Sequence, residues 1–228
     1  MDAGRVRAEE FNARNIESNM ARYIGPVCRH CRREGEKLFL KGERCYTSKC
    51  AVERREGAVP GQHGRGRQSF SEYKIRLREK QKLKRTYRLL EKKFKSYYMR
   101  AARKRGVTGS QMLLALETRI DNVVYRLGFA SSRIQARQLV SHGHILVNGH
   151  RVVSPAYEVE VNDLVEVVEG MKKNSTLVAA MDSAAARLIP EWLSLDKAEA
   201  KGVIKALPTR EMLSQTVNEQ LIVELYSK

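Results

Sequence analysis

The chain has 228 residues, 42% of them hydrophobic, which is enough for a folded core and excludes full disorder. No apolar run approaches the roughly 20 residues of a membrane-spanning helix, and residues 1–19 lack the apolar centre of a secretion signal, so we expect a cytoplasmic protein with reduced thiols. The net charge of +17 favours a polyanionic partner, nucleic acid before an acidic membrane surface.

Residues 1–19 form a polar extension, which we expect to be disordered or to reflect a misplaced start. Residues 20–64 are rich in Gly, Cys and Arg and show little periodicity, so this segment needs a staple other than a hydrophobic core. All four cysteines of the chain lie here in a C-x2-C and a C-x4-C pair: Cys28, Cys31, Cys45 and Cys50.

Two close cysteine pairs let four thiolates surround one soft cation. The spacing therefore predicts a structural metal site, with Zn2+ as the default and a [4Fe–4S] cluster as the alternative. A reduced compartment disfavours disulfides, and His30 is a weaker candidate ligand because four cysteines already complete the set. Four protein ligands leave no open position, so we expect no catalytic role for the metal.

Residues 65–115 are predicted to form a basic helical body. Its first part, 65–105, carries 17 basic and 3 acidic residues and so holds most of the excess charge. A shift in the apolar phase between Leu77 and Leu83 predicts a kink or two helices. Apolar residues at 4,3,4,3 spacing predict a helix further on: Leu83, Tyr87, Leu90, Phe94 and Tyr97.

Cations crowd the stretch 74–88, where only Glu79 opposes them. Neighbouring cations repel one another, and a phosphate backbone relieves that repulsion, so we predict a nucleic-acid surface; a solvated charged face is the alternative. The candidate contacts in the N-terminal region and the body are Arg54, Arg55, His63, Arg65, Arg67, Lys74, Arg76, Arg78, Lys80, Lys82, Lys84 and Arg85.

Residues 116–181 are predicted to form a small α+β module. A first helix over 111–127 ends at Gly128, and Ser132 with Gln135 has the capping-box spacing of a second helix. Asn148-Gly149 between apolar runs predicts a hairpin, because both residues tolerate positive φ. Alternating residues around 159–161 and the run 164–168 predict further strands of a small antiparallel sheet.

Four arginines of this module recur at 7,7,4 spacing and are predicted to share one face. Their planar guanidinium groups suit phosphate geometry, so together with two histidines and an asparagine they are predicted to clamp an RNA backbone. An ordinary surface or half-buried side chain is the alternative for each histidine. The candidates are Arg119, Arg126, Arg133, Arg137, His142, His144 and Asn148. In the tail, 182–228, the apolar run 221–225 predicts a strand or a helix turn.

The run LETRIDNVVYRLGFASSRIQARQLVSHGHILVNG, 116–149, closely resembles the RNA-binding module named after the fourth protein of the small ribosomal subunit. Residues 20–64, residues 74–94 and the segments PEWLSLD and NEQLIVELYSK resemble the other parts of that bacterial ribosomal protein family. The resemblance implies an α+β fold with a metal-stapled N-terminal region, a helical body, an inserted module of two helices and a small sheet, and a tail that packs back on the body.

The resemblance also implies a structural protein that binds 16S rRNA directly, nucleates assembly of the 30S body and contributes to decoding accuracy near the mRNA entry channel. The implied neighbours are ribosomal proteins three and five of the small subunit and mRNA, with no membrane and no small-molecule substrate. By matching position, the four cysteines become metal ligands and the seven module candidates become RNA contacts.

Two other functions are alternatives for this sequence. Arg119-Ile120-Asp121 is similar to the catalytic Arg-Leu-Asp run of pseudouridine synthases, which would make the chain an RNA-modifying enzyme, but the remaining length leaves no room for a separate catalytic domain. A zinc-dependent DNA-binding regulator would need a recognition helix, and the cysteine region has no obvious one between its pairs. We therefore expect a ribosomal protein and not an enzyme.

Overall fold

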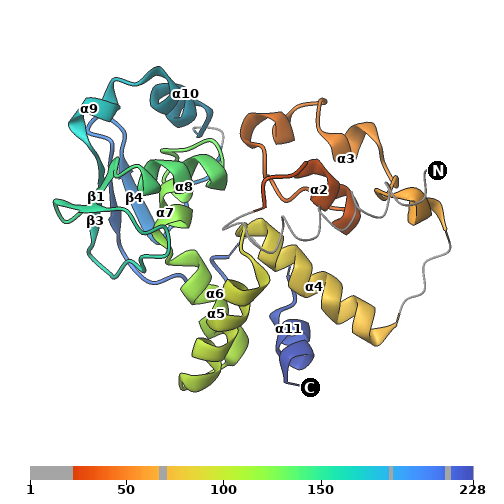
Figure 1. Ribbon diagram of the computed structural model, residues 1–228. Helices are drawn as coiled ribbons and strands as arrows, with labels where there is room; N and C mark the ends of the chain where they lie inside the picture. Colours follow the sequence, from red (N-terminus) through yellow and green to blue (C-terminus); the bar gives the residue numbers. More distant parts are fainter. Residues whose placement is uncertain (1–22, 67–70, 185–186, 214–216, 228) are drawn as a thin grey trace, which may run out of the picture.

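The computed structural model (Figure 1) describes residues 23–66, 71–184, 187–213 and 217–227. The predictions for residues 1–19 and for Arg67 lie outside the described residues, as do those for the side chains of His63 and Arg65. Three separate groups of buried apolar side chains divide the chain into an N-terminal region, a helical body and a module that contains the sheet.

The N-terminal region consists of short helices joined by loops: α2 (Cys28–Glu34), η1 (Gly42–Tyr46), α3 (Ala51–Arg54) and η2 (Gln62–Arg65). Its core is small and consists of Val27, Cys31, Leu38 and Leu40. Helix α2 packs against α3 and against the first helix of the body. A core of this size is weak support for so many loops, as expected for a segment that needs an additional staple.

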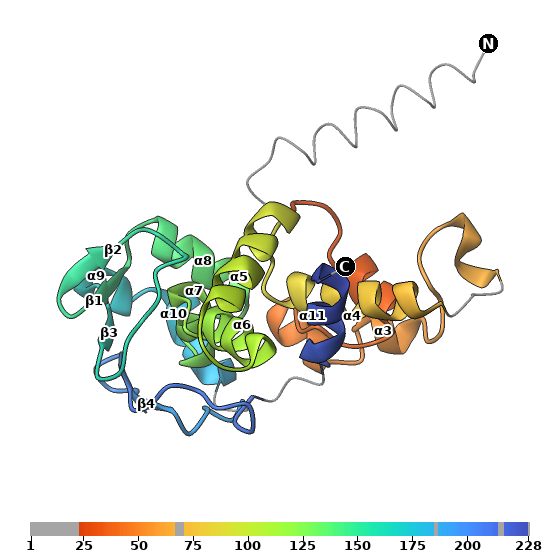
Figure 2. The ribbon, with the colours of Figure 1, turned by 90° about the horizontal axis from the view of Figure 1, so that it is seen from below.

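The helical body contains α4 (Glu72–Thr86), α5 (Glu91–Arg103), α6 (Thr108–Glu117) and α11 (Glu219–Tyr226). Helix α4 begins at a Ser71 cap, whose Oγ accepts a hydrogen bond from the backbone N–H of Lys74. The kink expected between Leu77 and Leu83 is wrong, because α4 runs unbroken from 72 to 86. Helix α4 packs against α2 of the N-terminal region and against α11, and both views show it close to these elements (Figure 1 and Figure 2).

The module contains α7 (Ile120–Arg126), α8 (Arg133–Ser141), β1 (Ile145–Val147), β2 (His150–Val152), β3 (Leu164–Val167), α9 (Glu169–Lys172), α10 (Ser175–Ala184), β4 (Leu193–Asp196) and β5 (Lys201–Ile204). All strand pairs are antiparallel, and the order in the sheet is β2-β1-β3-β5-β4. The α+β fold class and the hairpin at Asn148-Gly149 are confirmed; both turn residues have positive φ.

The segment 111–127 forms two helices, α6 and α7, instead of the single helix expected. Between them Arg119 has an extended backbone and pairs with Glu158 as an isolated β-bridge. The N–H of Ile120 donates to the carbonyl of Tyr157 at 2.8 Å, and the N–H of Val159 donates to the carbonyl of Thr118 at 3.0 Å. These two bonds satisfy the backbone groups at the break. They involve Tyr157 and Val159, whereas the strand expected around 159–161 is absent from the described residues.

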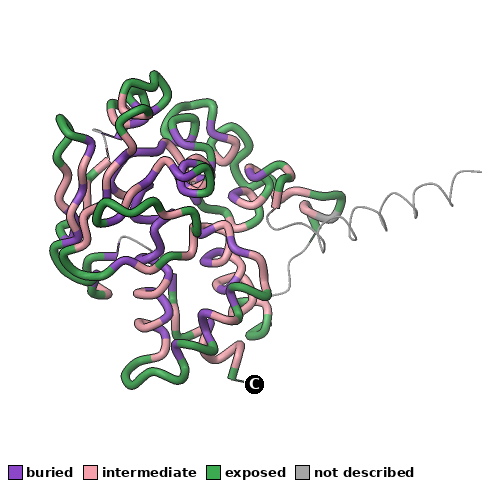
Figure 3. Tube along the Cα trace, turned by 60° about the vertical axis from the view of Figure 1, so that its left-hand side comes forward, coloured by how far each residue is buried: buried purple, intermediate pink, exposed green. Residues whose placement is uncertain are grey.

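The tail is divided between the two larger parts of the molecule. Strands β4 and β5 extend the module's sheet next to β3, and α11 packs against α4 and α6 of the body. Figure 3 shows buried residues along the inner sides of the packed elements and exposed residues along the outer loops. In the described part of the chain, no helix combines the length and the apolar character needed to cross a membrane.

Candidate nucleic-acid interface

The basic face of α4 is matched by acidic residues from other parts of the chain. Glu34, at the end of α2, accepts hydrogen bonds from Arg78 at 3.3 Å and from Arg85. Lys82 donates to Glu36 at 2.8 Å. These pairs fasten the N-terminal region to α4.

The same helix is fastened to the rest of the body from its other side. Lys80 and Lys84 donate to the two oxygens of Glu91 at 2.6 and 2.9 Å, and Arg76 donates to Glu224 on α11 at 2.8 Å. Burial raises the pKa of Glu91, but hydrogen bonds from Lys80, Lys84 and Tyr226 outweigh it and bring the pKa to about 2. Six of the predicted RNA contacts therefore make internal ion pairs in this structure, and Lys74 lies beside them on the first turn of α4.

Arg126 lies in a buried network at the joint between body and module. Glu117 has no exposed surface and accepts from Arg126 at 2.8 Å, from the Tyr87 hydroxyl at 2.6 Å and from Asn122 at 2.7 Å. Burial raises the pKa of Glu117, but the charge of Arg126 and its hydrogen bonds prevail and bring the pKa to about 2. The network thus holds an ionised carboxylate at the joint.

Arg119 is 1% exposed and is held by Asp121 and by the Tyr97 hydroxyl, to which it donates at 2.7 Å. Because its guanidinium is engaged by these two partners, the structure does not favour the predicted RNA contact of Arg119, which stays a prediction. Asp121 is itself buried in this pair, so the structure gives no support to a catalytic role for it.

The remaining module candidates are partly or fully exposed. Arg133 donates to Asn122 at 2.9 Å and lies over the ring of Tyr125, while Arg137 is 4.0 Å from Asp121. His142 is exposed and His144 is half-buried, with their ring centroids 6.0 Å apart. Asn148 is exposed, but its side chain bonds Asp163 and the backbone of Leu164, so it holds the hairpin against β3.

The exposed cations of the body lie on α5 and just after it, where no acidic residue occurs from 92 to 116. Lys92, Lys95, Arg103, Lys104 and Arg105 are exposed and make no ion pair among the described residues. We call these five residues the α5 strip. None of them was singled out from the sequence, although the absence of acids over this window is a signal that could have identified them. Arg54 and Arg55, which were predicted, are also exposed.

A basic pocket of about 530 Å³ lies beside the α5 strip, between the body and the module. Its cationic lining comes from Arg88, Lys92, Lys93, Arg119 and Arg137. Leu89, Leu90 and Pro155 supply an apolar wall, and no acidic residue is among the described residues that line it. This combination suits an anionic ligand with an apolar part.

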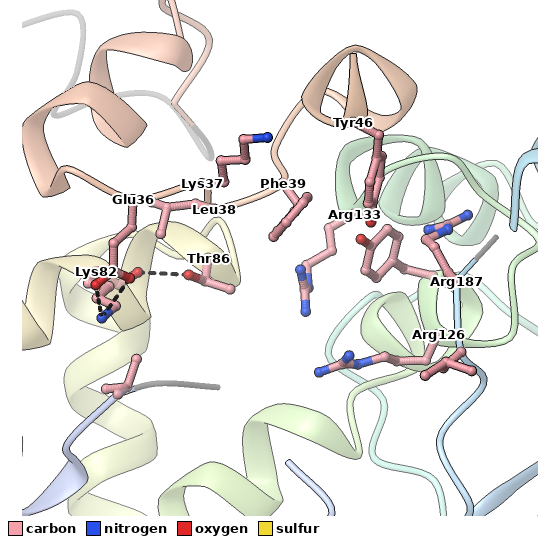
Figure 4. Close-up of a pocket in the computed structure, with 13 residues that line it drawn as sticks. Glu36, Lys37, Leu38, Phe39, Tyr46, Lys82, Thr86, Arg126, Arg133 and Arg187 are labelled. Carbon is pink, nitrogen blue, oxygen red and sulfur yellow. Dashed lines mark hydrogen bonds and ion pairs between the residues drawn. The ribbon is translucent and has the colours of Figure 1, made fainter. Parts of the chain in front are cut away.

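A second cleft, of about 500 Å³, separates the N-terminal region from the module (Figure 4). Phe39 and Tyr46 lie on the side of the N-terminal region, and Tyr125, Arg133 and Arg187 lie on the side of the module. We call it the aromatic cleft. The N-terminal region and the module also approach each other closely at Gly42, where an added Cβ would lie 2.8 Å from the carbonyl oxygen of Ser131.

The four cysteines are free thiols, and three of them are buried. Burial raises the pKa of Cys31 to about 11; the charges of Cys45, Cys28 and Cys50 also raise it, so the four sulfurs lie within electrostatic reach of one another. The N–H of Lys41 donates to Cys45 Sγ at 3.4 Å. Four neighbouring thiols with a backbone donor fit the donor set of a thiolate-bound metal. Among the described residues, however, no three His, Cys, Asp or Glu side chains are placed to hold an ion, so the metal staple stays a prediction.

Comparison with known proteins decides the family. Residues 22–117 match the ribosomal protein S4/S9 N-terminal domain, and residues 118–165 match the S4 domain. Small ribosomal subunit protein uS4 of Geotalea daltonii is 55% identical over 209 residues, which are 92% of this chain and all of the relative. The protein of the same name from Syntrophobacter fumaroxidans is 57% identical over the same shares. The chain belongs to the uS4 family.

Membership in the uS4 family confirms the resemblance drawn from the sequence. The division between the two matched domains falls at residues 117 and 118, next to the buried Glu117 and the extended Arg119. The relatives are named as ribosomal proteins, in agreement with the prediction that the chain is not an enzyme.

Proposed function

We propose that this chain binds 16S rRNA directly, as a structural component of the small ribosomal subunit in the cytoplasm. The observation that carries the proposal is the α5 strip: five exposed cations without an acidic partner among the described residues, in a protein whose other main basic helix is neutralised internally. Phosphates would relieve the repulsion between these cations and release counterions.

The basic pocket extends this surface. Lys92 belongs to both the strip and the pocket, and Lys93 and Arg137 continue the positive charge toward the module. An RNA strand that follows α5 would therefore reach the module through a pocket that has no acidic residue among its described lining residues. The cations of α5 keep a fixed arrangement because α5 packs against α6. A rigid array of cations favours folded RNA over a flexible polyanion.

The test compares two triple charge reversals. Lys92→Glu, Lys95→Glu and Lys104→Glu change the strip, whereas Lys173→Glu, Lys197→Glu and Lys205→Glu change three exposed lysines on the module side by the same net charge. Binding to the 5′ domain of 16S rRNA is measured by filter retention across a salt series. We expect the strip variant to weaken binding more than the control and to lower the salt slope by about 1 for each lost phosphate contact. Equal behaviour of the two variants would contradict the proposal.

We also propose that Cys28, Cys31, Cys45 and Cys50 hold a structural Zn2+, with a [4Fe–4S] cluster as the alternative. The proposal is supported by the chemistry of four neighbouring free thiols and by the small core of the segment that carries them. A bound metal supplies cross-links between α2, η1 and α3, and these would offset the conformational entropy of the loops.

The finer roles follow from the family resemblance. We propose that the chain nucleates assembly of the 30S body, neighbours ribosomal proteins three and five, and contributes to decoding accuracy near the mRNA entry channel. Stepwise reconstitution of small subunits tests this: omission of the chain should block later proteins from joining, and the α5 strip variant should delay the same step. Normal incorporation of later proteins without the chain would exclude the assembly role.

A further inference from the structure

The aromatic cleft contains features that contact with an RNA backbone does not require. Tyr46, on the short helix η1, is 55% exposed. Large aromatic side chains are more often buried than this. Its ring lies 5.0 Å from that of Phe39, at 31° between the ring planes. The two rings present a hydrophobic surface to an open space of about 500 Å³, within the roughly 300–1,000 Å³ range of small-molecule sites.

Fixed guanidinium groups line the module side of this space. Arg133 and Arg187 lie 4.6 and 4.8 Å from the ring centre of Tyr125. Arg133 donates to Asn122 at 2.9 Å, and Arg187 donates to the carbonyl of Ala130 at 3.0 Å. In Figure 4 the rings of Phe39 and Tyr46 enter this space from the N-terminal region, and the side chain of Arg133 enters it from the module. Because these groups are already oriented, a ligand entering the cleft would lose little free energy in ordering them.

The charge of the lining selects the class of ligand. Arg133 and Arg187 line the cleft and make no ion pair among the described residues. Three further cations of the lining, Lys37, Lys82 and Arg126, are already paired with Glu53, Glu36 and Glu117. Aromatic rings and guanidinium planes are the surfaces on which unstacked RNA bases stack, and the same cations suit a phosphate. An apolar ligand would leave the cations unused, and an acidic peptide would leave the aromatic rings unused.

We infer that the aromatic cleft receives one unpaired nucleotide of the bound RNA, with its base against Phe39 and Tyr46 and its phosphate toward Arg133 and Arg187. The inference rests on the proposed RNA-binding function and deepens it, because it adds a site that reads an extruded base to a surface that follows the backbone. The N-terminal region and the module would then close on the same nucleotide from two sides.

The test uses the full chain and the 5′ domain of 16S rRNA. Tyr46→Ala removes the ring, Tyr46→Phe keeps it, and Tyr73→Ala removes an equally exposed tyrosine, 62% exposed, on α4. Loss of one base-stacking contact weakens binding by roughly 5- to 150-fold, so we expect a loss in that range for Tyr46→Ala and near wild-type affinity for the other two. The salt slope should not change, because stacking releases no counterions.

Ultraviolet cross-linking with mass spectrometry provides a second measurement. We expect a nucleotide adduct on Phe39, Tyr46 or Tyr125 and none on Tyr73. Wild-type affinity of Tyr46→Ala together with adducts only elsewhere would overturn the inference, even if the α5 strip variant binds weakly. If the strip variant also binds normally, the proposed function itself fails. Free nucleoside monophosphates serve as a separate probe in competition with RNA for cross-linking to Tyr46. If a monophosphate blocks the cross-link at the same concentration as unlabelled RNA does, the assignment of the cleft to RNA is overturned.

Discussion

Arg119 and Asp121 form a two-point ion pair inside the joint between body and module, with Nε and Nη2 at 3.0 and 2.6 Å from the two carboxylate oxygens. Both side chains are buried, and the Tyr97 hydroxyl accepts a further hydrogen bond from the guanidinium. Removing one partner of such a pair leaves the other charge in a poorly solvated place, which costs far more than the intact pair contributes.

Asp121→Asn is therefore expected to lower the free energy of unfolding by about 3–5 kcal/mol. Urea unfolding followed by circular dichroism measures this change. Asp182→Asn, at an exposed aspartate of α10, is the matched control and should change stability by less than about 0.5 kcal/mol. Equal stability of the two variants would show that the pair does not support the joint.

The Glu117 network predicts a dependence of stability on pH. Burial raises the pKa of Glu117, but Arg126 overcomes this and lowers it from 4.5 to about 2, so the folded protein binds the proton more weakly than the unfolded chain does. The stabilisation is fully present above about pH 4.5 and is lost as the pH falls toward 2, up to about 3 kcal/mol in all.

Glu117→Gln should be less stable than wild type at pH 7, and the difference should shrink between pH 4.5 and pH 2. Denaturant titrations at several pH values measure it. Glu160→Gln changes an exposed carboxyl of the module and should leave the pH profile as it is. A Glu117→Gln profile parallel to that of wild type would contradict the low pKa.

Gly42→Ala is expected to loosen the N-terminal region from the module. The position combines a φ of +62° with the Ser131 carbonyl oxygen 2.8 Å from an added Cβ. Gly57 has a φ of +67° and nothing within 4 Å of an added Cβ, so Gly57→Ala carries the backbone cost of about 1 kcal/mol alone. Limited proteolysis should cut residues 36–60 faster in Gly42→Ala than in Gly57→Ala; equal rates would show that the close approach to Ser131 has no effect.

Metal removal tests the cysteine site. Cys31→Ser, or chelation of the wild-type protein, should release the bound zinc and expose the N-terminal region to proteases, because structural zinc contributes roughly 10–16 kcal/mol to such folds. Elemental analysis and protease mapping measure the two effects. Thr47→Ser, at an exposed position between Cys45 and Cys50, should keep the metal. If the protein contains neither zinc nor iron when it is purified from cells, the predicted metal site is contradicted.

Local patterns predicted the elements that local physics determines. Asn148-Gly149 forms the predicted turn because both residues adopt positive φ. Ser132 begins α8 because its side chain accepts from the N–H of Gln135 at 3.4 Å. In each case the atoms that decide the structure are within a few residues of one another, so a short stretch of sequence contains the information.

Long-range partners could not be predicted in the same way. The count of charges over 74–88 found one acid, but the carboxylates that neutralise α4 come from Glu34, Glu36 and Glu224 as well as Glu91. Helical spacing placed Arg119 on a shared face with Arg126, whereas the extended backbone at Arg119 turns it inward. The exposed aromatic Tyr46 has no local signal, because its role depends on the module across the cleft.

The position of β5 in the sheet has a consequence for synthesis of the chain. Strand β3 has β1 on one side and β5 on the other, and β5 follows β3 by more than 30 residues along the chain. Helix α11, which packs against α4 and α6, comes later still. A nascent chain that still lacks these residues has an open sheet edge and an uncovered helical face. Both cores are therefore completed only after β5 and α11 have been synthesised, so a product truncated before β5 would expose an unpaired strand edge and an apolar helix face.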